Sequence, residues 1–228
     1  AAENQAGSLA SGQVAQSRLS FAQEPPASYG RESIPDILPL GQILRRYLVA
    51  HVGQELQIID QHTAHERVIF ERLWRNWQTR TLTAQPLLMP ELVELSVAQW
   101  TVLQSHLGEL EQLGLCLESF GAATVAIRAV PAGLGNPAGA ALVQDLLDDL
   151  AQWDRASSLD DRARPVLASL ACHSAVRAGR AMALPEISQL IADWIQEGLI
   201  TTCPHGRRTV FRLSTDELDK LFGRAGWS

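Results

Sequence analysis

The sequence predicts an α+β fold in which a small αβ segment is inserted into a larger one. Three observations support this class. Segments with the alternation of strands and segments with helical spacing follow one another from about residue 36 onward. Hydrophobic residues make up 46% of the chain, and no apolar run is long enough to cross a membrane. The composition therefore excludes wholesale disorder and predicts a buried core.

The first part of the chain predicts a strand-to-helix turn that carries polar side chains. Residues 1–35 are rich in small and polar residues and are expected to form a flexible linker. Apolar spacing predicts a short helix over 37–44, a strand over 56–60 and a helix over 64–77. Residues 60–62 are therefore expected at a turn where their side chains converge.

Alternating patterns between residues 85 and 153 predict a compact αβ insert. The expected elements are strands over 87–95, 115–119 and 124–130 and helices over 97–113 and 138–150. Pro131 is expected to stop the last of these strands, because proline has no N–H for the sheet.

The C-terminal part is predicted to be mainly helical. The expected elements are helices over 165–180 and 185–196, a tight turn at 203–206 and a strand over 209–213. Pro185 and Gly198 fit the preference for proline at a helix start and glycine just past its end. Ser214 and Glu217 have the spacing of a capping box for a last helix.

The net charge argues against nucleic-acid binding by charge alone. Lys and Arg number 19 against 25 Asp and Glu, so the formal charge of −6 repels phosphate backbones at long range. Binding to DNA must then be local or assisted by a partner. The N-terminus lacks a secretory signal and there are three cysteines, which favours an intracellular protein with buried or metal-bound thiols over a disulfide framework.

Four of the six histidines and two of the three cysteines fall in three short segments, residues 60–66, 171–173 and 203–206. His62 and Glu66 are four apart and would share one face of a helix. Cys172, Cys203 and His205 offer sulfur and nitrogen donors that favour zinc. The carboxylates of the same segments favour manganese or magnesium, so a mixed site with two metal ions would suit both sets.

Simpler explanations exist for single members of this set. A lone cysteine on an alanine-rich helix, such as Cys172, is usually core packing, and a histidine near a helix start is usually a cap or a surface group. No C-x-x-C pair anchors a metal site. The order of residues 62–66 matches neither H-E-x-x-H nor H-x-x-E-H, which argues against a zinc peptidase.

Residues 60–71 closely resemble the endonuclease motif D-Q-H-A-x-x-E-x-x-x-x-E of the MutL family of DNA mismatch-repair proteins. Further segments that resemble family motifs, in the same order, are Ala171-Cys172, residues 203–207 and Phe211-Arg212. The resemblance covers about residues 36–225. It implies a dimerisation and endonuclease subdomain built from residues 36–83 and 161–228, with a regulatory subdomain inserted over 84–160.

The resemblance implies metal-dependent nicking of double-stranded DNA in mismatch repair. The implied catalytic residues are Asp60, Glu66 and Glu71, and the implied metal ligands are Asp60, His62, Glu66, Cys172, Cys203 and His205. A catalytic Mn²⁺ or Mg²⁺ is expected at Asp60, and a structural or regulatory Zn²⁺ at the thiols. Arg207 and Arg212 are candidates for contacts with DNA phosphates.

Three residues depart from the family pattern without removing an implied ligand. Thr63 replaces alanine, His173 stands where arginine or lysine is usual, and Arg208 replaces proline. His173 could compete as a further ligand.

Residues 85–90 resemble the Q-x-x-L/I-x-P element with which bacterial MutL nucleases bind the replication sliding clamp. The clamp-binding candidates are Gln85, Leu87, Leu88, Met89 and Pro90. An extended peptide of this kind inserts apolar side chains into a groove. An edge strand ended by proline explains the same residues, and the two interpretations are compatible. Residues 16–21 also fit the more general clamp form Q-x-x-L-x-F.

The resemblance also implies the partners. We expect a homodimer that binds the sliding clamp, binds double-stranded DNA weakly by itself and reaches the mismatch-recognition protein through an N-terminal region missing here. No membrane partner is expected, and the implied location is the cytoplasm near the nucleoid. The alternative is a non-catalytic, zinc-stabilised module for dimerisation and clamp binding.

Overall fold

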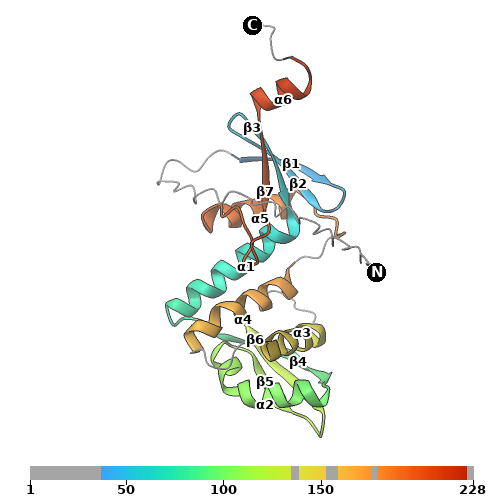
Figure 1. Ribbon diagram of the computed structural model, residues 1–228, viewed down its shortest axis with the longest axis vertical. Helices are drawn as coiled ribbons and strands as arrows, with labels where there is room; N and C mark the ends of the chain where they lie inside the picture. Colours follow the sequence, from blue (N-terminus) through green and yellow to red (C-terminus); the bar gives the residue numbers. More distant parts are fainter. Residues whose placement is uncertain (1–36, 135–138, 153–158, 176–178, 225–228) are drawn as a thin grey trace, which may run out of the picture. The chain divides into compact units, whose positions relative to one another are not determined.

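The computed structural model describes residues 37–134, 139–152, 159–175 and 179–224 (Figure 1). These residues belong to one compact unit, Pro35–Ser228. The linker predicted over 1–35 and the clamp-like peptide at 16–21 lie outside the described residues, so both stay predictions. The predicted α+β class is confirmed, because helices accompany two antiparallel sheets.

A four-stranded antiparallel sheet joins the two ends of the described chain in the order β1-β2-β3-β7. Its strands are β1 (Ile37–Ile43), β2 (Tyr47–Val52), β3 (Glu55–Asp60) and β7 (Val210–Ser214). Leu48 pairs with Ile59, which pairs with Val210, so these three side chains share one face and are buried there. The alternation along each strand gives the sheet one covered face.

The prediction of a helix over residues 37–44 is wrong, because this segment forms strand β1. Its apolar residues have helical spacing, but Pro39 and Gly41 both disfavour a helix interior. Pairing with β2 provides backbone hydrogen bonds, and its register shifts between Pro39 and Gly41. The irregularity breaks the two-residue alternation that would have revealed a strand.

Helix α1 (Gln61–Gln78) begins directly after β3. Asp60 caps it, because its Oδ1 accepts the backbone N–H of His62 at 2.9 Å and of Thr63 at 3.0 Å. The cap starts the helix three residues before the predicted position at Ala64. The polar residues 60–62 therefore lie at the predicted strand-to-helix junction.

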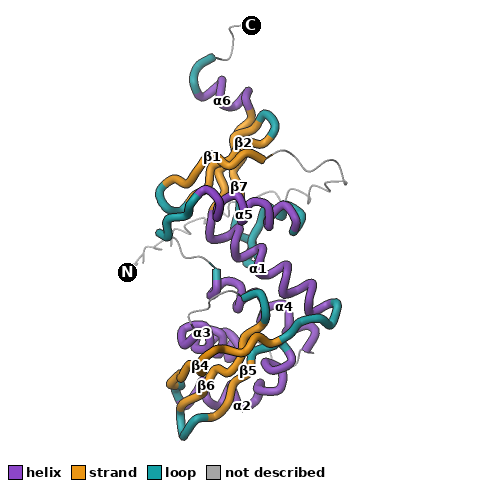
Figure 2. Tube along the Cα trace, turned by 180° about the vertical axis from the view of Figure 1, so that it is seen from behind, coloured by secondary structure: helices purple, strands orange, loops and turns teal. Residues whose placement is uncertain are grey.

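Two hydrophobic cores lie along α1. The four-stranded sheet, the start of α1 and α5 (Leu184–Gln196) form the first core, which buries Trp194. The rest of α1 packs with the second sheet and with α2 (Val97–Gln112), α3 (Gly139–Gln152) and α4 (Leu159–Ser174) in the second core. Figure 1 and Figure 2 both show α1 beside α4. Helix α1 thus connects the two cores.

The second sheet is three-stranded, in the order β4-β6-β5, and its elements follow the predicted types and order. Its strands are β4 (Ala84–Glu94), β5 (Cys116–Ser119) and β6 (Thr124–Pro131). The pairing of β4 with β6 shifts between Pro86 and Glu91, so the intervening residues bulge from the ladder. The predicted division into subdomains stays a prediction, because contacts place residues 35–228 in one unit.

The C-terminal elements follow the prediction with different boundaries. Helix α4 contains Pro165 in its second turn instead of beginning there, and it ends at Ser174, not at residue 180. Helix α6 (Thr215–Leu221) has the predicted capping box of Ser214 and Glu217. Among the described helices, none has the length and apolar character needed to span a bilayer.

Candidate metal centre

Candidate donors from three elements meet beside the first turns of α1. The donors are His62 and Glu66 on α1, Cys172 on α4, and Cys203 and His205 on the loop between α5 and β7. Their ligand atoms form two groups, each with all atoms within 4.8 Å of one another. Glu66 belongs to both groups. The fold therefore brings together five of the six residues predicted as metal ligands.

Glu66 is fully buried and links the two groups, with 0% of its surface exposed. Its Oε1 lies 2.6 Å from Nδ1 of His205. Its Oε2 is buried and has no hydrogen-bond partner in the described part of the chain. An unpartnered buried carboxylate oxygen is costly, so this atom calls for a cation or another donor.

The loop from Cys203 to Thr209 holds the second group in place. The Cys203 N–H donates to the Arg207 carbonyl at 2.8 Å, and the Gly206 N–H donates to the Cys203 carbonyl at 2.9 Å. Gly206 has φ +82°, which favours glycine. The Thr209 carbonyl accepts the Asp60 N–H at 2.8 Å. The predicted tight turn is confirmed, and its loop is tied to the start of α1.

The electrostatics of the site favour a cation. Burial, together with the nearby charge of Glu66, raises the pKa of Cys172 to about 11. Burial also raises the pKa of Cys203. Two thiolates and a carboxylate in one buried region would concentrate negative charge, and a divalent cation offsets that cost.

The donor chemistry fits zinc. Tetrahedral ligands at about 2.0 to 2.3 Å from zinc lie about 3.3 to 3.8 Å from each other. The observed spacing within 4.8 Å needs only small side-chain adjustments to reach that range. Sulfur and imidazole suit zinc, whereas the carboxylate is also acceptable to manganese or magnesium. The residues present therefore fit a divalent metal ion.

Comparison with known proteins identifies the family. Residues 40–182 match the family model described as the MutL C terminal dimerisation domain. The chain belongs to the MutL family. It is 41% identical over 190 residues to the DNA mismatch repair protein MutL of Paramagnetospirillum magneticum, covering 82% of this chain and 31% of that protein. The protein of the same name from Rhodopseudomonas palustris is 38% identical over 221 residues, covering 90% of this chain and 37% of that protein. This chain spans about a third of the length of these relatives.

Two acidic residues of the MutL-like motif lie outside the donor groups of the described residues. Asp60 caps α1 through Oδ1. Glu71 forms an ion pair with Arg67, with 2.8 Å between Oε1 and an Nη atom. Five residues after Glu66, Glu71 points from a different side of the helix. Catalytic roles for Asp60 and Glu71 stay predictions.

The other residues predicted from the MutL resemblance lie outside the two donor groups. His173 faces α3, with Nδ1 3.1 Å from Oδ2 of Asp145, and it is in neither donor group. Arg207 is exposed and its carbonyl holds the loop. Arg212 lies on β7 opposite Gln57. Contacts of Arg207 and Arg212 with DNA stay predictions.

Three charged or titratable residues near the MutL site were not identified from the sequence. Burial, and then Arg180, lowers the pKa of His65 to about 4. Arg67 and Arg164 both lie over the ring of Phe70. Arg67 follows Glu66 directly in the motif, which is a signal that could have been used. Arg164 ends a polar stretch and has no such signal.

The segment predicted to bind the clamp lies in β4. Leu88 and Met89 are 105% and 80% exposed, whereas Leu87 packs against the second core. Both exposed residues fall where the β4–β6 pairing shifts. The site therefore presents two apolar side chains outside the sheet ladder.

Proposed function

We propose that this MutL-family chain is a metal-dependent endonuclease domain that nicks double-stranded DNA during mismatch repair. One observation carries the proposal: Glu66 is fully buried, is shared by both donor groups and has an unpartnered oxygen. A packing role alone does not explain a buried carboxylate oxygen without a hydrogen bond. The names of the relatives support a role in mismatch repair.

Bound metal ions would stabilise charge on the phosphodiester and activate water. The protein's part is to hold acidic and neutral donors in fixed directions. Two backbone N–H groups orient the Asp60 carboxylate through Oδ1. Glu66 orients His205 through the contact between Oε1 and Nδ1.

Elemental analysis combined with plasmid nicking tests this function. The 228-residue chain should contain zinc after purification and should nick supercoiled plasmid when Mn²⁺ is added. Glu66→Gln should lose zinc and nicking together, whereas Glu118→Gln, which removes an exposed charge on β5, should lose neither. A wild-type chain that binds no divalent metal contradicts the proposal.

The alternative is a zinc-stabilised module for dimerisation and clamp binding without chemistry. Two observations favour this alternative. The capping role explains Asp60 without catalysis, and the sulfur donors suit a structural zinc site. It predicts that zinc removal lowers the melting temperature, while no metal supports nicking. The proposed endonuclease predicts nicking that Asp60→Asn abolishes with zinc content unchanged.

The outer face of the four-stranded sheet is the surface we propose for homodimerisation. Ile58 pairs with Val49 and with Phe211, so these three side chains share the face opposite the first core. Phe211 and Leu38 are 49% and 57% exposed on this face. The family model is described as a dimerisation domain. An exposed apolar sheet face is a typical contact surface for a second copy of the chain.

Sedimentation measures this contact directly. Phe211→Glu should convert dimers to monomers, because a charge would be buried at the apolar interface. Phe120→Glu is the matched control, since Phe120 is 59% exposed outside the four-stranded sheet. Equal dimer stability in wild type and Phe211→Glu contradicts the assignment.

The sliding clamp is the partner proposed for residues 85–90. The exposed Leu88 and Met89 can enter an apolar groove without unfolding the second core. Tethering to a clamp on DNA also compensates for the net charge of −6. Leu88→Ala should weaken clamp binding, measured by calorimetry, while Leu92→Ala, also exposed on β4, should not.

A further inference from the structure

Two guanidinium groups share one aromatic ring beside the donor set. The Cζ atom of Arg67 lies 5.5 Å from the Phe70 ring centre, and that of Arg164 lies 5.8 Å from the same centre. Arg164 is also 5.6 Å from the Trp74 ring centre, and the two rings are stacked. Contacts with ring faces hold the guanidinium groups in place but leave their charges unneutralised.

Arg67 is paired with a carboxylate, whereas the described contacts of Arg164 are with aromatic rings. Glu71 forms an ion pair with Arg67, whose Nε is buried without a partner. Both guanidinium groups lie over the same ring of Phe70, so the two cations are close to each other. Arg164 is exposed, so its guanidinium group is open to solvent. An anion from solvent can therefore reach the Arg164 guanidinium group.

A hollow next to Arg164 has room for that anion. Phe70, Arg164, Pro204 and His205 contribute to its lining, and its volume is about 390 Å³. Because His205 is also a candidate metal ligand, an occupant of the hollow would lie beside the donor set. Asp149 lines the same hollow, and its Oδ2 accepts the Ser169 hydroxyl at 2.7 Å.

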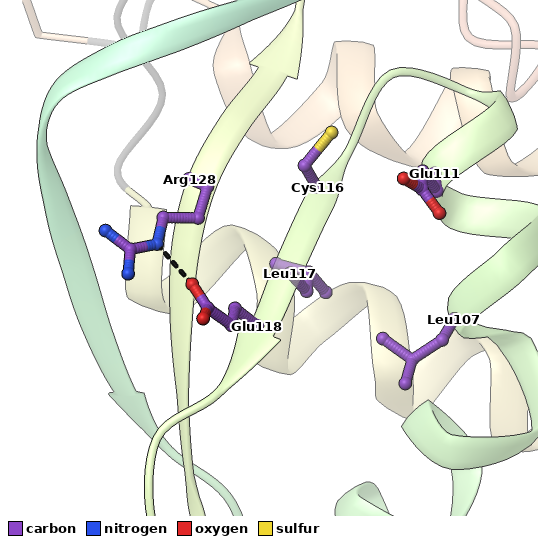
Figure 3. Close-up of a pocket in the computed structure, with 6 residues that line it drawn as sticks. All are labelled: Leu107, Glu111, Cys116, Leu117, Glu118 and Arg128. Carbon is purple, nitrogen blue, oxygen red and sulfur yellow. Dashed lines mark hydrogen bonds and ion pairs between the residues drawn. The ribbon is translucent and has the colours of Figure 1, made fainter.

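A second hollow provides a comparison, because its arginine forms an ion pair with a carboxylate. It lies between α2 and β5, and Figure 3 shows Arg128 and Glu118 pointing toward each other there. Arg128 Nε lies 2.5 Å from Glu118 Oε2, and Glu111 adds another acid to the lining. This hollow offers no surplus positive charge. Arg128 is thus paired with a carboxylate in its hollow, whereas Arg164 contacts aromatic rings in the other.

We propose that Arg164, supported by Arg67, binds a backbone phosphate of double-stranded DNA in the hollow beside His205. The inference rests on the proposed endonuclease function and names a substrate contact for it. A guanidinium group can donate two parallel hydrogen bonds to a phosphate. Fixing one phosphate there would hold a neighbouring phosphodiester next to the donors on α1. The contact would also give a net-acidic chain a local site for DNA.

Salt-dependent binding of a fluorescent duplex tests this contact without requiring cleavage. The logarithm of the binding constant is measured against the logarithm of salt concentration for the 228-residue chain without Mn²⁺ or Mg²⁺. Arg164→Gln should reduce the magnitude of the slope by about 0.9, the value for one phosphate contact, and Arg164→Lys should restore it. Arg128→Gln removes the same formal charge in the other hollow and should leave the slope unchanged.

The outcomes separate this contact from the endonuclease function. Equal slopes for wild type and Arg164→Gln, equal losses in both Gln variants, or no duplex binding at low salt would overturn the phosphate site. If wild type and Arg164→Gln show the expected difference in slope but wild type nicks no plasmid, the endonuclease function is contradicted. The phosphate site is then still supported. If the endonuclease function and the phosphate site are both correct, Arg164→Gln should slow Mn²⁺-dependent nicking about tenfold with zinc content unchanged.

Discussion

The two halves of helix α1 differ in how their buried polar atoms are satisfied. The described residues contain five buried side-chain nitrogen or oxygen atoms without a hydrogen-bond partner, and three lie on Gln61, Glu66 and Arg67. The second half buries Leu73 and Trp77 in the apolar core. One helix therefore carries a segment with unsatisfied buried polar atoms and a segment packed in an apolar core. We expect packing of the second half to offset the cost of the buried polar atoms in the first.

Leu73→Ala should produce the largest loss of stability. Leu73 is completely buried in the second core, so the substitution removes apolar contacts and leaves a cavity. The free energy of unfolding should fall by about 2–5 kcal/mol in a denaturant titration. Zinc bound per folded chain should be unchanged below the transition. Loss of zinc from the still-folded variant would show that the halves of α1 are not separable.

Glu197→Gln should have an intermediate effect. Its buried carboxylate joins α5 to the second half of α1 through ion pairs with Arg72, at 3.4 Å, and with Arg75. The two arginines are 39% and 56% exposed, so solvent screens part of the attraction. We expect a loss of about 1–2 kcal/mol in the free energy of unfolding. A change below about 0.3 kcal/mol would make this ion-pair cluster irrelevant to stability.

Glu66→Gln should change the stability of the metal-free chain by less than about 1 kcal/mol, because the variant removes a buried charge that lacks a partner on Oε2. Calorimetry with and without added zinc provides the measurement. Zinc should raise the melting temperature of wild type but not of Glu66→Gln. A large loss of stability in the metal-free variant would mean that Glu66 is chiefly structural.

Asp60→Asn should have the smallest effect on stability, less than about 0.5 kcal/mol, because asparagine also caps helices. The same variant should lose Mn²⁺-dependent nicking, which needs the carboxylate charge. Asp60→Ala, which removes the cap, should cost about 1 kcal/mol by comparison. Nicking by Asp60→Asn at the wild-type rate would reduce Asp60 to its capping role.

The sequence indicated most of the donor set because local spacing and short motifs carry it. His62 and Glu66 are one helical turn apart, and the Cys203-Pro204-His205-Gly206 turn places its donors locally. The sharing of Glu66 was beyond sequence reasoning, since its contact with His205 spans 139 residues. The unpartnered Oε2 of Glu66 results from burial by segments that are distant in the sequence. Hydrophobic periodicity does not show which distant segments pack together.

The errors in the predicted fold have equally local causes. Strand β1 was mistaken for a helix because its register shift hides the alternation of its apolar residues. Helix α4 was expected to begin at Pro165, but a proline can also lie within a helix at the loss of one hydrogen bond. Arg164 was not identified because only tertiary contacts place it over Phe70.

X-ray absorption at the zinc edge tests the central claim most directly. The 228-residue chain loaded with zinc should show a mixed shell of sulfur and nitrogen or oxygen, with sulfur at about 2.3 Å and the lighter atoms near 2.0 to 2.1 Å. Cys172→Ser and Cys203→Ser should each reduce the sulfur contribution. A zinc shell without sulfur, or one unchanged in Glu66→Gln and both serine variants, would contradict a metal centre built around Glu66.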